Sequence, residues 1–149
     1  DANLIMEGSD VYMGYARVLA RFNAEKEMQY IKRLSGARDI VIFGTGYVGN
    51  AAYVFLRNNG LKNIRAFCDN GSDRQGIKLY GVDSISPEEA SSRYHGAVFI
   101  VAVRSKQDEI AEQLMLLGVA GENVIPYILP TDPAFCTNCL IKKRLCIKA

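Results

Sequence analysis

The chain has 149 residues, of which 49% are hydrophobic and 23% charged, and its formal net charge is +2. This length suits one domain with its own core, and is too short for a nucleotide-binding domain plus a full catalytic domain. The small net charge, with basic residues dispersed along the chain, argues against nucleic-acid binding, and a mean hydropathy of +0.00 argues against disorder and membrane insertion.

No apolar run approaches the roughly 20 residues that span a bilayer, and the first residues lack the basic and apolar regions of a secretory signal. We therefore expect no membrane span and a cytoplasmic protein. The four cysteines are unequally spaced, which favours reduced thiols over a disulfide framework. Because Asp1 takes the place of an initiator Met, we expect the chain to be a piece of a larger protein with further domains.

Residues 1–36 are predicted to form an N-terminal helical extension. Tyr12, Tyr15, Leu19 and Phe22 recur at helical spacing, and Ser35-Gly36 marks the end of the pattern. The apolar face changes phase around residues 23–26, so one bent helix and two short helices are both open.

Residues 37–130 are predicted to form a Rossmann-like nucleotide-binding domain, followed by a Cys-containing tail over residues 131–149. Strands alternate with helices, which predicts an α/β three-layer sandwich with a mostly parallel sheet. In chain order we expect a strand at Ile40–Phe43, a helix from Gly46 to Asn59-Gly60, a strand at Ile64–Cys68, extended pieces at Ile77–Tyr80 and Val82–Ile85, a helix starting at Ser86-Pro87, a central strand at Ala97–Val103, a helix capped by Ser105 and ending at Gly118, and a strand at Asn123–Ile128.

The strongest motif is the glycine turn Gly44-x-Gly46-x-x-Gly49, which directly follows the first strand. Gly44 allows a tight turn, Gly46 lets the backbone approach a phosphate, and Gly49 lets helix and strand pack closely. The helix that begins here offers N–H groups and a positive dipole end to an anion. We therefore expect a ligand that contains a nucleotide at this turn.

Asp69 ends the second strand, twenty residues after Gly49, where an acid accepts hydrogen bonds from ribose hydroxyls. It favours free ribose hydroxyls over a 2′-phosphate, although Arg74 five residues later weakens that preference. Arg104 and Ser105 follow the central strand and are either phosphate-binding residues or a solvated side chain and a helix cap. The residues expected to bind the cofactor or nucleotide ligand are Gly44, Thr45, Gly46, Tyr47, Val48, Gly49, Asp69, Asn70, Arg104 and Ser105.

The runs IVIFGTGYVG, IRAFCDNGSDRQGIKLYGVDSISPEEA and EQLMLLGV resemble the Rossmann modules of bacterial cell-surface polysaccharide and nucleotide-sugar biosynthesis proteins. Those modules include the N-terminal domains of sugar-nucleotide acetyltransferases and of membrane-associated sugar-nucleotide dehydratases. The spacing of Phe67, Asp69, Gly76 and Gly81 is also similar to the NADH-sensing domain of Rex repressors. These resemblances imply NAD or a nucleotide sugar as the ligand.

Whether the chain is an enzyme stays open at this point. No tyrosine has a lysine four residues later, so the acid–base pair of short-chain dehydrogenases is missing, and the single histidine, His95, is expected to be an ordinary surface or capping residue. Three functions remain: a nucleotide-binding module, an NAD-dependent oxidoreductase or NADH sensor, and an oligomerisation module without ligand. S-adenosylmethionine is a further candidate ligand, although the first strand lacks the acid common in methyltransferases.

Cys136, Cys139 and Cys146 have spacings seen in zinc and iron–sulfur sites, but the local sequence offers no fourth ligand. We therefore expect no metal, and keep these three cysteines as the weak candidates. The alternative is an amphipathic tail that packs on the domain or on a partner. A homodimer through the N-terminal helix or this tail is the expected assembly.

Overall fold

The structure is a computed structural model that describes residues 24–128. The chain divides into two units, and the unit described in detail below is Ile31–Ile128, while residues 24–30 belong to the other. Residues 24–35 are helical, as the N-terminal pattern predicts for that stretch. The remainder of the predicted extension and the Cys-containing tail lie outside the described residues, so the domain boundaries at residues 36 and 130 stay predictions.

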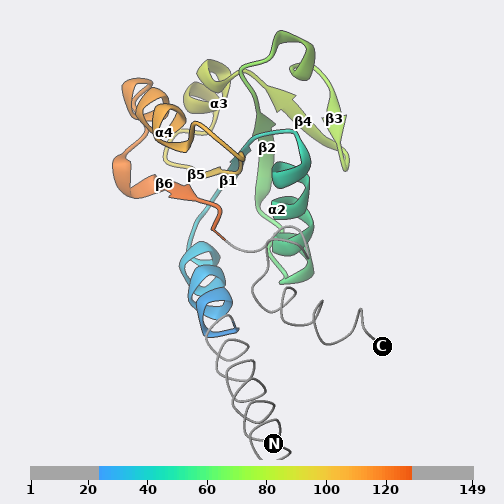
Figure 1. Ribbon diagram of the computed structural model, residues 1–149, viewed down its shortest axis with the longest axis vertical. Coiled ribbons are helices and arrows are strands. Elements are labelled where there is room, and N and C mark those ends of the chain that lie inside the picture. Colours follow the sequence, from blue (N-terminus) through green and yellow to red (C-terminus); the bar gives the residue numbers. More distant parts are fainter. Residues whose placement is uncertain (1–23, 129–149) are drawn as a thin grey trace, which may run out of the picture. The chain divides into compact units, whose positions relative to one another are not determined.

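Strands and helices alternate through the unit. In chain order they are β1 (Ile40–Phe43), α2 (Tyr47–Asn58), β2 (Ile64–Cys68), β3 (Lys78–Leu79), β4 (Val82–Ile85), α3 (Pro87–Arg93), β5 (Val98–Val101), α4 (Gln107–Leu116) and β6 (Val124–Pro126) (Figure 1). Short 3-10 turns, η1 (Ser72–Arg74) and η2 (Gly121–Asn123), lie after β2 and before β6.

The six strands form one sheet in the order β3-β4-β2-β1-β5-β6. Ile42 of β1 pairs in parallel with Phe67 of β2 on one side and with Ile100 of β5 on the other. The β2–β4 and β5–β6 pairs are also parallel, and only the edge hairpin β3–β4 is antiparallel. The predicted Rossmann-like α/β fold with a mostly parallel sheet is therefore confirmed.

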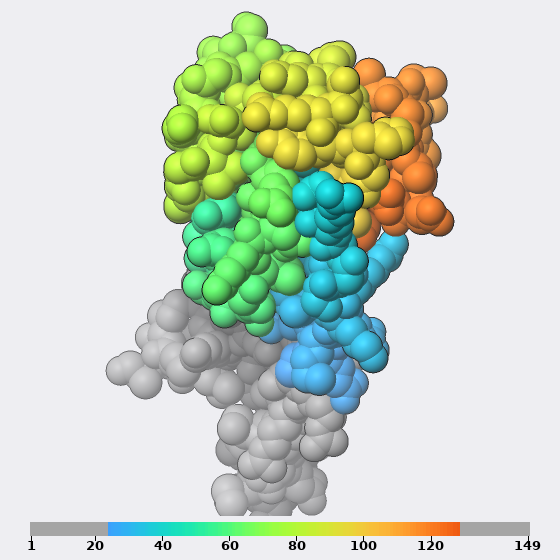
Figure 2. Space-filling model, turned by 180° about the vertical axis from the view of Figure 1, so that it is seen from behind, coloured from blue at the N-terminus to red at the C-terminus, as the bar shows by residue number. Residues whose placement is uncertain are grey.

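All four residues of β1 are buried, which is why this strand is continuously apolar. Val41 and Phe43 belong to a core cluster with Ala90 of α3 and Leu114 of α4. Because side chains alternate along a strand, the other β1 residues face the opposite layer, where α2 contacts β1. Seen from behind, the yellow segment lies between the green and the orange segments on the surface of the unit (Figure 2).

The helix start predicted at Ser86-Pro87 is confirmed, because a side chain caps the helix there. The Ser86 side chain accepts a hydrogen bond from the Glu89 N–H at 3.1 Å, and Pro87 is the first residue of α3. The prediction that Ser105 caps the next helix is wrong, because the N-cap of α4 is Lys106, in a left-handed conformation with φ 64°. β5 ends at Val101, two residues earlier than expected, so the chain needs an additional turn before the helix begins.

Candidate functional site

The glycine turn follows β1, the strand at which the strand order of the sheet reverses. β1 has β2 on one side and β5 on the other, so the chain first builds outward from β1 in one direction and later crosses to the other. In open α/β sheets, ligands bind outside the carboxyl ends of the two strands at such a switch point. Here those ends lead into Gly44 after β1 and into the segment before Arg104 after β5.

Gly44 has to be glycine because of two separate constraints. Its φ is +123°, and an added Cβ would lie 2.2 Å from the carbonyl oxygen of Ala102. The Gly44 N–H donates to the Cys68 carbonyl at 2.9 Å, and the Ala102 N–H donates to the Phe43 carbonyl at 2.8 Å. The turn therefore lies directly between the ends of β2 and β5, as the tight-turn role predicts.

Gly49 and Gly46 differ in why they are glycines. A Cβ on Gly49 would lie 1.9 Å from the Gly44 carbonyl oxygen, so the first turn of α2 packs directly on the turn. At Gly46 the φ of −87° suits any residue, and within residues 24–128 no atom outside the adjoining backbone lies within 4 Å of an added Cβ. The described chain itself gives no reason for a glycine at this position, and the space beside the backbone is open.

The start of α2 carries features that suit an anion. No acidic residue lies in its first turn, and its N-cap, Gly46, makes no side-chain cap hydrogen bond. Val48 is half-buried in this first turn. The Arg104 guanidinium carbon lies 5.3 Å from the ring centroid of Tyr47, so the loop after β5 brings a cation to the first residue of the helix. Ser105, beside it, is exposed.

Asp69 follows β2 and turns its carboxylate toward the glycine turn. Its Oδ2 accepts hydrogen bonds from the Thr45 N–H at 3.2 Å and from the Thr45 hydroxyl at 2.7 Å. Its Oδ1 accepts the Gly71 N–H at 2.9 Å. Three acceptor positions of the Asp69 carboxylate, which the expected ribose hydroxyls would need, are thus used within the protein.

Arg74 completes this arrangement from the turn η1. Its Nε donates to the Thr45 hydroxyl at 2.9 Å, and its Nη2 donates to the Thr45 carbonyl at 2.9 Å. Thr45 is only 2% exposed, so its side chain is a structural part of the turn. Sequence reasoning named Arg74 only for its charge, because nothing in the spacing shows that it reaches back across 29 residues.

Asn70 lies beside Asp69 and pairs with a residue that the sequence analysis did not identify. Its Nδ2 donates to Gln113 Oε1 at 2.9 Å, and Gln113 Nε2 donates to Asn70 Oδ1 at 2.7 Å. Both side chains are in a solvent-exposed setting. The pair joins the end of β2 to α4, and two amides 43 residues apart give no sequence signal for such a contact.

Cys68, the last residue of β2, is buried directly before Asp69. Burial, followed by the charges of Asp69 and Glu88, raises the pKa of the thiol. The thiol is therefore protonated and suits packing rather than nucleophilic attack. Within residues 24–128, no group of three metal-ligating side chains is present, and the tail cysteines lie outside that range.

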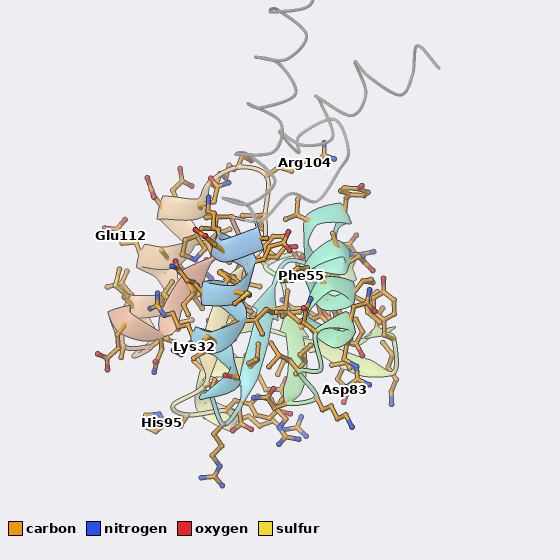
Figure 3. The ribbon with its side chains drawn as sticks, turned by 90° about the horizontal axis from the view of Figure 1, so that it is seen from below. Lys32, Phe55, Asp83, His95, Arg104 and Glu112 are labelled. Carbon is orange, nitrogen blue, oxygen red and sulfur yellow. The ribbon has the colours of Figure 1, made fainter. Side chains whose placement is uncertain are left out.

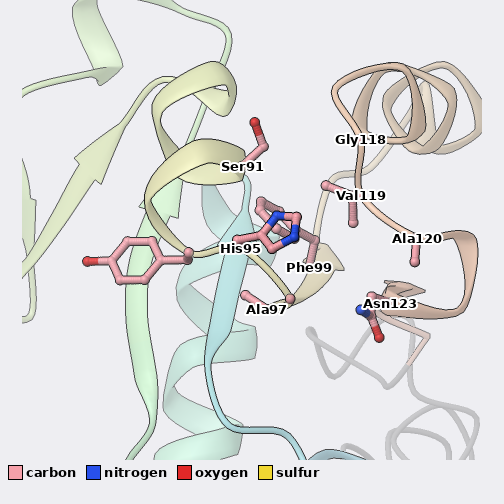
Figure 4. A pocket seen from close by; sticks show the side chains of 10 residues that line it. Ser91, His95, Ala97, Phe99, Gly118, Val119, Ala120 and Asn123 are labelled. Atoms are coloured by element: carbon pink, nitrogen blue, oxygen red, sulfur yellow. The ribbon is translucent and has the colours of Figure 1, made fainter.

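A cavity of about 200 Å³ lies at the other ends of the strands (Figure 4). It is lined by His95, Ser91, Phe99 and Asn123, among others. Figure 3 shows His95 and Arg104 at opposite ends of the unit. Ligand pockets are usually about 300 Å³ or larger, so this cavity is smaller than most of them.

The fold, the switch point and the glycine turn define a Rossmann-like α/β domain. Residues 36–125, more than half of the chain, match the family described as C2185-like, N-terminal. The chain belongs to this family. A comparison with curated proteins finds no match.

Solved structures are similar in fold at low sequence identity. RSP, a Rex-family repressor, has a TM-score of 0.54 and 17% identity, over 83% of this chain and 66% of the repressor. RSP in complex with beta-NADH has a TM-score of 0.52, with the same identity and coverage. UDP-D-quinovosamine 4-dehydrogenase from Vibrio fischeri has a TM-score of 0.48 and 20% identity, over 56% of this chain and 75% of the dehydrogenase. The described residues contain no helix long and apolar enough to cross a membrane.

Proposed function

We propose that the chain is a nucleotide-binding module that takes NAD(H) or a nucleotide sugar at the turn Gly44–Gly49. In this proposal the module acts in the cytoplasm, within a larger bacterial protein of cell-surface polysaccharide or nucleotide-sugar metabolism, as the motif resemblance suggests. The Rossmann-like fold and the conformation of the glycine turn support the first part of the proposal, and a fold neighbour solved with beta-NADH is in keeping with it.

The observation that carries the proposal is the open space at Gly46. Gly44 and Gly49 are glycines because protein atoms would collide with a Cβ, whereas a Cβ on Gly46 would meet no atom of the described residues beyond its adjoining backbone. A glycine without an internal reason, at the N-terminus of a helix, suits a backbone that a phosphate approaches closely. The residues present therefore fit the expected ligand at its phosphates.

Three groups around the turn would hold such a ligand. The first turn of α2 would face the phosphates, and Arg104 with Ser105 would approach them from the loop after β5. Asp69 and Asn70, after β2, would border the ribose. These groups bind and orient, so we propose binding rather than a chemical step as the function of this chain.

A thermal-shift and calorimetry panel with NADH, UDP-N-acetylglucosamine and S-adenosylmethionine tests the proposal. NADH or the nucleotide sugar should raise the melting temperature of the protein, because a ligand that binds the native state stabilises it. Gly46→Val should stay folded, with a loss of stability of about 1 kcal/mol because an N-cap favours glycine over valine. It should lose about tenfold or more in affinity, roughly 1.4 kcal/mol or more.

Gly36→Ala is the matched control, since a Cβ there makes only an ordinary contact of 3.9 Å and the position is remote from the turn. It should leave affinity unchanged. If the wild-type protein responds to none of the three ligands, or if Gly46→Val binds as tightly as the wild type, the proposal is wrong.

The NADH sensor or oxidoreductase is the second candidate, favoured by the fold similarity to the repressor solved with beta-NADH. It predicts a clear preference for NADH over the nucleotide sugar in the same panel. An oligomerisation module predicts a concentration-dependent dimer and no ligand response, which sedimentation at several concentrations measures.

A further inference from the structure

We propose that Asp69 is a positioning residue that holds the glycine turn through Thr45, and that it does not read the ribose hydroxyls. The proposal departs from the usual role of an acid after the second strand. Its consequence for the ligand rests on the proposed function, whereas its geometric part rests on contacts between described residues alone.

Thr45 is the residue that the arrangement holds. Its N–H and hydroxyl both donate to Asp69, and its hydroxyl and carbonyl both accept from Arg74. The carbonyl also accepts the Asn50 side-chain N–H at 3.0 Å. Every polar group of a 2% exposed residue therefore has a partner, as buried polar groups require.

The acceptor capacity of Asp69 points the same way. A carboxylate offers about four lone-pair positions, and three of them are used by Thr45 and Gly71. A ribose that presents two adjacent hydroxyls would need two further acceptor positions. Direct reading of the ribose would therefore displace a hydrogen bond that holds the turn.

Arg74 supplies the balancing charge through the Thr45 hydroxyl. Within residues 24–128 Arg74 forms no ion pair. The Thr45 hydroxyl accepts a hydrogen bond from Arg74 and donates one to Asp69, so this hydroxyl links the two opposite charges. The buried Ser84 hydroxyl donates to the Arg74 carbonyl at 2.5 Å, and Gln75 Nε2 donates to the Asp69 carbonyl at 2.8 Å. Hydrogen bonds to their backbone carbonyls therefore hold both Arg74 and Asp69 in place.

The function of this arrangement is to set the direction of the peptide that leads into Gly46. Thr45 lies between Gly44 and Gly46, and its orientation determines where the first N–H groups of α2 lie. Charge-assisted hydrogen bonds are stronger and shorter than neutral ones, which suits a turn that has to be rigid before the ligand arrives.

Calorimetry on Thr45→Val, Asp69→Asn and the double variant tests the proposal, with NADH compared with its analogue that lacks the adenosine 2′-hydroxyl and UDP with 2′-deoxy-UDP. Each single variant should lose about tenfold in affinity, and the double variant should lose no more than either, because both remove one arrangement. Thr45→Ser, which keeps the hydroxyl, should bind as the wild type does. In Asp69→Asn the affinity ratio within each ligand pair should stay within about threefold of the wild-type ratio, roughly 0.6 kcal/mol.

Asp73→Asn is the matched control, because this exposed acid lies beside Arg74 in η1 and makes no hydrogen bond with the described residues. A change of more than about threefold in either ligand ratio in Asp69→Asn, roughly 0.6 kcal/mol, would show that Asp69 binds the ribose hydroxyls and would overturn the proposal. Unchanged affinity in Thr45→Val would overturn it as well.

Amide hydrogen exchange separates this proposal from the proposed function. The Thr45 and Gly71 amides should exchange about tenfold or more faster in Asp69→Asn than in Asp73→Asn, with no ligand present. If the wild type binds no nucleotide but this difference is seen, nucleotide binding fails and the positioning role of Asp69 stands. If both amides exchange at the wild-type rate, the positioning role fails.

Discussion

Asn70 and Gln113 exchange two amide hydrogen bonds, of 2.9 and 2.7 Å, between the end of β2 and the middle of α4. Each side-chain amide donates to the other and accepts from it, so removing either side chain leaves the other without both of these hydrogen bonds. Asn70, expected to bind ligand, is therefore engaged within the protein.

We expect this pair to behave as one unit in stability. Asn70→Ala and Gln113→Ala should each lower the free energy of unfolding by about 0.5–1 kcal/mol, because the bonds are exposed and replaceable by water. The double variant should lose less than the sum of the two. Urea denaturation of the three variants measures this coupling, and strict additivity would contradict it.

Gly44→Ala should be severely destabilising, whereas Gly118→Ala should not. Alanine at Gly44 adds both left-handed strain and a collision with the Ala102 carbonyl, and we expect a loss of about 2–5 kcal/mol. Gly118 has a φ of +99° but open space around an added Cβ, so it should lose only about 1–2 kcal/mol. Thermal and urea unfolding compare the two variants, and equal losses would show that the collision is relieved at little cost.

Tyr80 combines a favourable ring contact with an unfavourable backbone. Its ring stacks on Tyr53 of α2 at a centroid distance of 4.5 Å, while its φ is +55°. Both Tyr80→Gly and Tyr80→Ala lose the stack, but only glycine removes the strain. Tyr80→Gly should therefore be more stable than Tyr80→Ala by about 1 kcal/mol, measured by urea unfolding. The reverse order would mean that the backbone strain is negligible.

The buried thiol of Cys68 should make stability fall at high pH. Its pKa is raised in the folded protein, so its contribution is complete below the pKa of the unfolded thiol, about 8.5, and declines as the pH rises above it. The stability advantage of the wild type over Cys68→Ala should shrink between pH 8 and pH 10, by about 1.4 kcal/mol per pH unit above the unfolded pKa.

Urea denaturation at the two pH values tests this expectation, with Cys136, Cys139 and Cys146 replaced by serine in both proteins. A stability difference that does not change with pH would contradict it.

Continuous apolar runs and glycine stops predicted where the inner strands lie in the sequence. The bounds of β1 and β2 agree with the prediction, because each is a short apolar run between clear breaks. The outer strands were less accurate: Asn123–Ile128 was expected and Val124–Pro126 is observed. Edge strands are shorter because they pair on one side only, and hydrophobic pattern does not record pairing.

At the candidate site, the sequence predicted positions and missed partners. The spacing of the glycines conveyed their places between β1 and α2, whereas the contacts of Thr45 with Asp69 and Arg74 depend on how the fold brings together residues 24 and 29 positions apart. The Ser105 cap was wrong for the same reason, since where the chain leaves β5 is decided by pairing. The ligand roles of the ten expected residues stay predictions.

The β3–β4 hairpin has a consequence for how copies of the protein associate. One border of the sheet is a strand of two residues, Lys78 and Leu79, and the Lys78 ammonium lies 3.7 Å from the Asp83 carboxylate. A border this short and charged is a poor template for an added strand. Growth of the sheet from this border into fibres or strand-exchanged dimers is therefore disfavoured, and an assembly would have to use other surfaces.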